Sequence, residues 1–320
     1  MKAAISLVAV LSLASGALSA QPAPAPSWAL AIHGGAGTIP RNIPPAERDH
    51  YLASLTAALK LGQEALSQGG TSLDVVEKVV RLLEDDPLFN AGKGAVFTHE
   101  GTNELDAAIM DGKTLSCGSV AGVKTVKNPI SLARMVMEKS PHVFMVGEGA
   151  EKFAEEMKVE RAPKEYFFTQ KRWDQLQAAL TKEAEVKDKG TVGAVALDRH
   201  GNLAAATSTG GMTNKRFGRL GDVPVIGAGT YANNRTCAVS GTGWGEKFIR
   251  KTVAHDISAL IEYANLSVQQ AAETVIAKLD KGDGGVIVVG REGDIALVFN
   301  SEGMYRGAAD STGRFEVAIW

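Results

Sequence analysis

The chain has 320 residues, of which 45% are hydrophobic, enough to bury a sizeable core in one large domain or two. Its formal net charge is −2 with both signs intermixed, so it lacks the charge excess typical of proteins that bind nucleic acid or anionic membranes. Its two cysteines, Cys117 and Cys237, exclude a disulfide framework and a cysteine-rich zinc site, and leave room for at most one disulfide.

The start of the sequence is typical of a cleavable signal peptide. Lys2 gives a short positive start, an apolar run follows, and small residues precede a cleavage site after Ser19 or Ala20. The apolar run is too short to span a bilayer. We therefore expect residues 1–20 to be removed, residues 21–26 to form a Pro/Ala-rich lead-in, and the mature protein to be periplasmic or secreted.

Alternating strand and helix patterns fill the first half of the mature chain. Residues 28–33 predict a short strand that runs into a glycine cluster, which allows a tight turn or close backbone approach. Helical spacing covers residues 46–68, 71–86, a segment starting at 128, 150–157 and 173–180, and two strands are predicted over 102–112 and 115–126. From about residue 161 to 189 the composition is polar, as in an exposed linker.

The loop at 83–93 mixes acidic residues, Pro and Gly. Its carbonyl oxygens could fold around a hard cation, or it could be an ordinary loop that ends a helix with solvated acids. Asn90 is the polar residue of an otherwise apolar turn and is a candidate hydrogen-bond donor. The six histidines are scattered and lack metal-ligand spacing, so no catalytic metal is indicated.

Residues 190–198 combine a glycine, a threonine and a continuous apolar run, which is typical of a buried strand. Two interpretations of Thr191 compete. It is a β-branched residue at the start of a strand, or it is the nucleophile of a self-cleaving Gly190–Thr191 bond. In the second case its freed α-amine, with a reference pKa of about 8, could act as the base for its own hydroxyl.

The second half adds a partner strand over 202–209 and a glycine-rich passage. Arg219 and Asp222 place a cation and an anion near each other, which suits the head group of an amino acid. The glycine alternation around Thr242 and Gly243 could form an oxyanion hole, or only a turn. Helices are predicted over 246–263 and 268–279, and strands over 284–290 and 294–300.

With these residues in view, the chain resembles the plant-type L-asparaginases, also called isoaspartyl or beta-aspartyl peptidases, of the N-terminal-nucleophile (Ntn) hydrolases. The resemblance spans nearly all of the mature chain. It is carried by the blocks HGGAG (33–37), GTVGAVALD (190–198), STGGMTNK (208–215), GRLGD (218–222) and NSEGMYRG (300–307). Several such blocks in one order favour the self-cleaving interpretation of Thr191.

The resemblance implies an α+β fold, a four-layer αββα sandwich of the Ntn-hydrolase type. It further implies self-cleavage into an α subunit, residues 27–190, and a β subunit, residues 191–320, that together form this one domain and assemble as an (αβ)2 heterotetramer. The expected substrates are small molecules, asparagine and beta-aspartyl peptides.

The resemblance also assigns roles to individual residues. Thr191 is the nucleophile and Thr209 the neighbouring hydroxyl, while Thr242, Gly243 and Asn90 serve the oxyanion. Arg219 is expected to bind the substrate α-carboxylate and Asp222 its α-ammonium, with Gly243 helping at that end. A structural sodium ion is implied at the main-chain carbonyls of Leu83, Glu84, Asp86, Phe89, Ala91 and Lys93, and no cofactor is needed for catalysis.

Two alternatives remain at this stage. Glycosylasparaginase shares the fold and nucleophile but acts on glycan-linked asparagine. An exported amino-acid-binding protein would use Arg219 and Asp222 without turnover and would stay uncleaved. Phe217, Val223 and Trp244 depart from the family pattern, and they could reshape the side of the site that holds the leaving group.

Overall fold

A computed structural model describes residues 27–182 and 190–320, together with Met1. Apart from Met1, the predicted signal peptide lies outside the described residues, and so does the whole lead-in. None of the helices in the described part of the chain combines the length and apolar content needed to cross a bilayer. The thiols of Cys117 and Cys237 are both free.

Twelve strands are present in the described residues. They are β1 (Ala29–Gly37), β2 (Leu105–Asp111), β3 (Cys117–Val123), β4 (Phe144–Val146), β5 (Val192–Leu197), β6 (Leu203–Thr209), β7 (Thr230–Ala232), β8 (Cys237–Gly243), β9 (Gly284–Gly290), β10 (Ile295–Phe299), β11 (Gly303–Asp310) and β12 (Phe315–Ala318). They form an eight-stranded sheet, in the order β12-β11-β1-β5-β6-β2-β3-β4, and a four-stranded sheet, in the order β10-β9-β8-β7. Only the β3–β4 pair is parallel.

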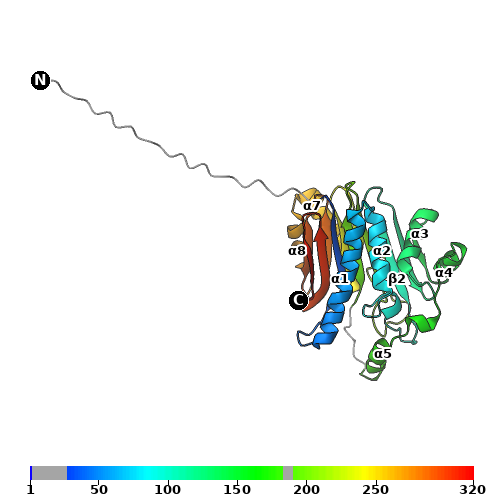
Figure 1. Ribbon diagram of the computed structural model, residues 1–320. Coiled ribbons are helices and arrows are strands. Elements are labelled where there is room, and N and C mark those ends of the chain that lie inside the picture. The colour runs from blue at the N-terminus through cyan, green and yellow to red at the C-terminus, as the bar shows by residue number, and fades with distance from the viewer. Residues whose placement is uncertain (2–26, 183–189) are drawn as a thin grey trace.

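Helices cover the outer faces of both sheets (Figure 1). The helices of the described residues are α1 (Pro45–Ser67), α2 (Ser72–Glu84), α3 (Pro129–Lys139), α4 (Gly147–Glu156), α5 (Gln170–Lys182), α6 (Gly245–Lys251), α7 (Val253–Ala264) and α8 (Val268–Ile276), with short 3-10 helices η1 (Gly92–Gly94) and η2 (Lys164–Phe167).

The core has three apolar layers. Two lie between a sheet and the helices that cover it, and one lies between the two sheets. The first joins α1, α2 and α3 to the large sheet through residues such as Leu55, Val76 and Ile32. The second lies between the sheets and consists largely of small and branched residues, and the third packs α7 and α8 on the small sheet. This arrangement confirms the predicted four-layer αββα sandwich, because each sheet buries one face against helices and the other against its partner sheet.

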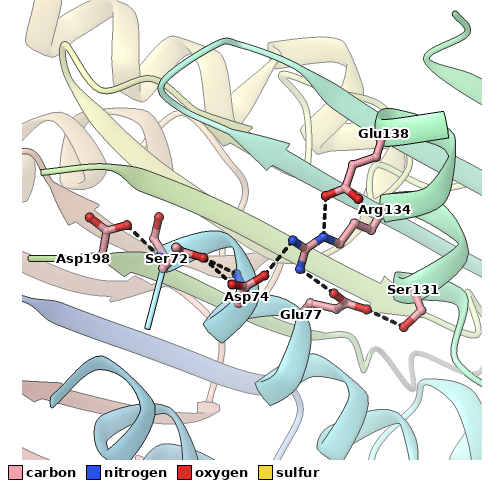
Figure 2. Close-up of polar contacts among 8 residues, drawn as sticks. Ser72, Asp74, Glu77, Ser131, Arg134, Glu138 and Asp198 are labelled. Atoms are coloured by element: carbon pink, nitrogen blue, oxygen red, sulfur yellow. Dashed lines mark hydrogen bonds and ion pairs between the residues drawn. The ribbon is translucent and has the colours of Figure 1, made fainter. Parts of the chain in front are cut away.

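Polar contacts fix the start of α2 to the large sheet, as Figure 2 shows. Asp198, the residue that follows β5, accepts a hydrogen bond from the backbone N–H of Ser72 at 2.9 Å. Arg134 of α3 pairs with the carboxylates of Asp74 (2.6 Å), Glu77 (2.7 Å) and Glu138 (2.7 Å). The C-terminal end of β5 is thus anchored, and its other end begins beside Thr191.

Two sequence predictions were wrong. The single helix expected over 246–263 is broken at Thr252, whose φ is +50°. The break is stabilised from a distance, because the backbone N–H groups of Ala254 and His255 donate to the carbonyls of Ala228 (3.1 Å) and Gly227 (2.8 Å).

The polar segment expected to be an exposed linker is largely folded. It contains η2 and α5, in which Phe167 and Leu176 are buried. The buried Arg172 donates from Nε to the carbonyl of Gly94 at 2.9 Å, which ties α5 to the loop after α2. Residues 183–189 lie outside the described residues.

Candidate active site

Asn90 holds three backbone segments together. Its Nδ2 donates to the carbonyls of Gly190 (3.0 Å) and Gly211 (2.8 Å), and its Oδ1 accepts from the backbone N–H of Val96 (3.0 Å). Two acceptors on one side and one donor on the other fix the orientation of the amide. The site needs glycine on both sides, because a Cβ at Gly190 or Gly210 would lie within 2.8 Å of Asn90 atoms.

Thr191 and Thr209 lie against the carbonyl that precedes Thr191. The Oγ1 of Thr191 is 2.8 Å from the Gly190 oxygen and 3.3 Å from the Oγ1 of Thr209. Thr209 Oγ1 is itself 3.1 Å from the Gly190 oxygen and accepts from the Gly211 backbone N–H at 3.0 Å. Thr191, Thr209 and Asn90 thus meet at the half-buried carbonyl of Gly190.

β1 brings Thr242 to the same region. Gly35 (φ +116°) lies so close to the bond that a Cβ there would be 3.0 Å from the Gly190 Cα and 3.4 Å from the Thr191 nitrogen. The next residue, Ala36, donates its backbone N–H to Thr242 Oγ1 at 3.1 Å. The glycine cluster after His33 therefore permits a close approach between the predicted cleavage site and the end of β8.

Arg219 and Asp222 form a second group at the start of α6. A Cβ on Gly245 would lie 2.9 Å from Arg219 Nη2 and 2.9 Å from Asp222 Oδ1, so both side chains converge on this glycine. Because Gly245 follows Thr242 by three residues, the end of β8 connects the two groups. Arg219 donates to Glu246 from Nε (2.9 Å) and Nη2 (2.8 Å). No pattern in the sequence predicts this ion pair.

Asp222 is buried, and its Oδ2 accepts no hydrogen bond from the described residues. Burial raises the pKa of this carboxyl to about 7, although the nearby Arg219 guanidinium acts in the opposite direction. An unpartnered buried acceptor is costly unless a ligand completes it. Such a group suits a cationic ligand atom.

A cavity of about 410 Å³ opens beside Asn90 and Gly190. Its wall includes Tyr51 and Tyr305, whose rings stack at 4.3 Å, and Lys171 from α5. A second cavity of about 340 Å³ adjoins Trp244. Trp244, the residue after Gly243, is one of the residues that line this second cavity.

Two glycines let the loop after α2 pass close to carbonyl oxygens of its own segment. Gly92 has a φ of +49°, and a Cβ there would lie 2.3 Å from the Glu84 oxygen. At Gly94 a Cβ would lie 2.0 Å from the Phe89 oxygen. The Glu84 and Phe89 carbonyls, two of the predicted sodium ligands, lie against Gly92 and Gly94 respectively, and an all-oxygen set would fit a hard cation. Within the described residues, side chains of His, Cys, Asp and Glu nowhere form a metal-binding group of three.

His33 also lies in this site, although no pattern in the sequence assigned it a role. It is fully buried, and its Nδ1 lies 3.0 Å from the carbonyl oxygen of Thr191. His33 and Thr191 are 158 residues apart in the chain, so no local pattern connects them. The glycine cluster that follows His33 is the one local feature that indicates a close approach of this segment to another.

The fold and this constellation together define an Ntn-type hydrolase, in which a threonine at the start of a buried strand faces a second hydroxyl and an amide donor. A family model described as "Asparaginase" matches residues 26–319. The chain belongs to the asparaginase family, which has the Ntn-hydrolase fold.

Three relatives illustrate the similarity. The isoaspartyl peptidase of Escherichia coli (strain K12) is 54% identical over 292 residues, covering 87% of this chain and 91% of the relative. The probable isoaspartyl peptidase/L-asparaginase 2 of Arabidopsis thaliana is 45% identical over 323 residues, covering 92% and 99%. The isoaspartyl peptidase/L-asparaginase of Rattus norvegicus is 42% identical over 302 residues, covering 92% and 89%.

Proposed function

We propose that this chain is a self-cleaving threonine hydrolase that converts isoaspartyl (beta-aspartyl) dipeptides and L-asparagine to L-aspartate. The observation that carries the proposal is the environment of the Gly190 carbonyl, which lies 2.8 Å from the Thr191 hydroxyl and also contacts Asn90 and Thr209. The names and identities of the relatives support the same reaction.

This arrangement supports self-cleavage by transfer of the Gly190 acyl group to the Thr191 hydroxyl. Thr191 Oγ1 attacks the Gly190 carbonyl carbon and passes its proton toward Thr209 Oγ1, 3.3 Å away. The Gly190 oxygen becomes an oxyanion, next to the Asn90 amide donor at 3.0 Å. The C–N bond then breaks, the Thr191 nitrogen takes up the proton, and an ester remains. Water hydrolyses the ester and leaves a carboxylate on Gly190 and a free amine on Thr191.

Turnover uses the same groups. The Thr191 amine removes the hydroxyl proton, the hydroxyl attacks the side-chain carbonyl of the substrate, and the amine or ammonia leaves protonated. Thr242, the Gly243 amide and Asn90 stabilise the oxyanion, and water then releases aspartate from the acyl-enzyme.

Arg219 and Asp222 explain the preference for beta linkages. They bind the α-carboxylate and α-ammonium of a free aspartyl head group, and the unpartnered Asp222 Oδ2 is the acceptor for the ammonium. An ordinary α-peptide has this carboxylate consumed in the peptide bond. An α-peptide would therefore offer no carboxylate to the free edge of the Arg219 guanidinium, which disfavours its binding.

Three further properties belong to the same proposal. The α subunit (27–190) and β subunit (191–320) assemble as an (αβ)2 heterotetramer, the precursor carries a signal peptide and is periplasmic or secreted, and a sodium ion stabilises the loop at 83–93 through its carbonyls. The sodium would order this loop and supplies no step of the reaction. Light scattering of the purified protein tests the assembly.

The main experiment is intact-mass analysis of the purified protein, with Thr191→Ala as the control. Two fragments that meet between Gly190 and Thr191, absent in the variant, are the expected result, together with aspartate release from a beta-aspartyl dipeptide. One stable intact chain with stoichiometric aspartate binding would instead indicate the binding protein. Preferential turnover of glycan-linked asparagine would indicate glycosylasparaginase, a name that none of the three relatives carries.

A further inference from the structure

Four buried polar side chains form a row between the two sheets. His33 of β1 contacts Ser240 of β8 (Nε2 to Oγ, 2.8 Å), Ser240 contacts Thr207 of β6 (2.7 Å), and Thr207 contacts Thr230 of β7 (2.7 Å). All four are fully shielded from solvent, in a layer otherwise filled by apolar residues. The first of them also reaches the Thr191 carbonyl.

The Thr191 carbonyl at one end of this row determines which group donates in each hydrogen bond. A carbonyl oxygen only accepts, so His33 Nδ1 must carry the proton that it shares with Thr191. Burial lowers the pKa of His33 to about 3, against a smaller opposite effect of the Thr191 carbonyl, so the ring is neutral and has one N–H. Its Nε2 must therefore accept from Ser240, whose oxygen accepts from Thr207, whose oxygen accepts from Thr230.

The space for this row depends on a glycine. Gly193 stands directly opposite His33 in the β1–β5 pair. A Cβ at this position would lie 2.1 Å from Ser240 Oγ and 2.4 Å from His33 Nε2. The second glycine of the motif that begins at Gly190 thus leaves room for the histidine–serine contact, which a larger residue would displace.

We propose that His33 is a positioning residue for the nucleophile, because its Nδ1–H fixes the carbonyl of Thr191 and the hydroxyl row satisfies the unprotonated Nε2 of that tautomer. This inference rests on the proposed function. Cleavage before Thr191 removes the covalent tether on its nitrogen side. Thr191, which then carries both the base and the nucleophile, remains attached to the chain only through its carbonyl. His33 donates a buried hydrogen bond to that carbonyl.

A pair of amide substitutions separates this role from simple packing. His33→Asn can place a donor near the Nδ1 position and loses the contact with Ser240, whereas His33→Gln can reach Ser240 and loses the donor to Thr191. Both variants break one buried hydrogen bond, so a structural role would affect them alike. Turnover is measured per cleaved chain, with the cleaved fraction taken from intact mass, and melting temperatures are recorded alongside.

We expect His33→Gln to lose about 100-fold in kcat with KM changed less than about threefold, because misplacement of the reacting groups acts on the chemical step. His33→Asn should retain a kcat at least about tenfold higher than His33→Gln despite a similar melting temperature. Equal kcat values for the two variants would overturn the positioning role.

Ser240→Ala provides a test if a His33 variant fails to fold. It leaves the imidazole in place and removes the hydroxyl that donates to Nε2 and holds the ring, so kcat should fall about tenfold at unchanged KM. Wild-type kcat in Ser240→Ala would contradict the hydroxyl row. Failure of the proposed function itself gives a different pattern, since the wild-type chain would then stay intact and release no aspartate.

Discussion

Removal of the Arg219 guanidinium should separate turnover from self-cleavage. In the structure its Nε and Nη2 donate to Glu246 at 2.9 and 2.8 Å, and 18% of its side chain is exposed. This contact occupies one edge of the planar group and leaves the Nη1–Nη2 edge for a substrate carboxylate. Arg219→Ala removes this bidentate partner, at a cost of about 3 kcal/mol in transition-state binding.

A loss of about 3 kcal/mol corresponds to a decrease of roughly 100-fold or more in kcat/KM for a beta-aspartyl dipeptide. Self-cleavage should proceed normally, because the Gly190 carbonyl is contacted by Asn90, Thr191 and Thr209 and not by Arg219. Steady-state kinetics and intact mass measure the two processes on the same sample. Glu246→Gln is the matched control, since it weakens the ion pair but keeps the guanidinium. Wild-type kcat/KM in Arg219→Ala, or a blocked cleavage, would refute the assignment.

Three other changes have defined outcomes. Because burial raises the pKa of Asp222 to about 7 and only the ionised form attracts an ammonium, kcat/KM should rise as the pH increases through about 7. Asp222→Asn should lose this component and keep only the rise that accompanies deprotonation of the Thr191 amine, whose reference pKa is about 8; a wild-type profile in that variant would contradict the role. Gly245→Ala puts a Cβ 2.9 Å from both Arg219 Nη2 and Asp222 Oδ1, so KM should rise about tenfold with cleavage unchanged, and an unchanged KM would argue against this pocket. Leu55→Ala empties a fully buried position and should lower the free energy of unfolding by about 2–5 kcal/mol, measured by urea in the uncleaved Thr191→Ala background; a loss under about 1 kcal/mol would contradict the packing.

Local pattern was sufficient for much of the fold. α1 and α2 were predicted within a few residues, because their apolar faces repeat with helical spacing and Thr71 caps α2 by accepting from Asp74. β5 and β6 were predicted from continuous apolar runs around a short turn. The break at Thr252 escaped prediction, because the groups that stabilise it come from residues 227–228 and leave no mark on the helical pattern.

The candidate site shows the same division. The proximity of Thr191, Thr209 and Asn90 agrees with the expectation drawn from the family blocks, although the roles of these residues stay predictions. The contact of Arg219 with Glu246 and that of His33 with Thr191 join residues 27 and 158 positions apart. Neither spacing has a sequence signature, since His33 meets Thr191 through the pairing of β1 with β5, and Arg219 meets Glu246 where a loop lies against the start of α6.

The strand order of the large sheet has a consequence for the two halves of the chain. β1, from the first half, lies between β5 and β11 of the second, and β2 of the first half pairs with β6 of the second. A cut at Gly190 would therefore yield two polypeptides whose strands alternate within one hydrogen-bonded sheet. They could not dissociate without dismantling the core, so the cut protein should melt as a single cooperative unit and resist separation by dilution.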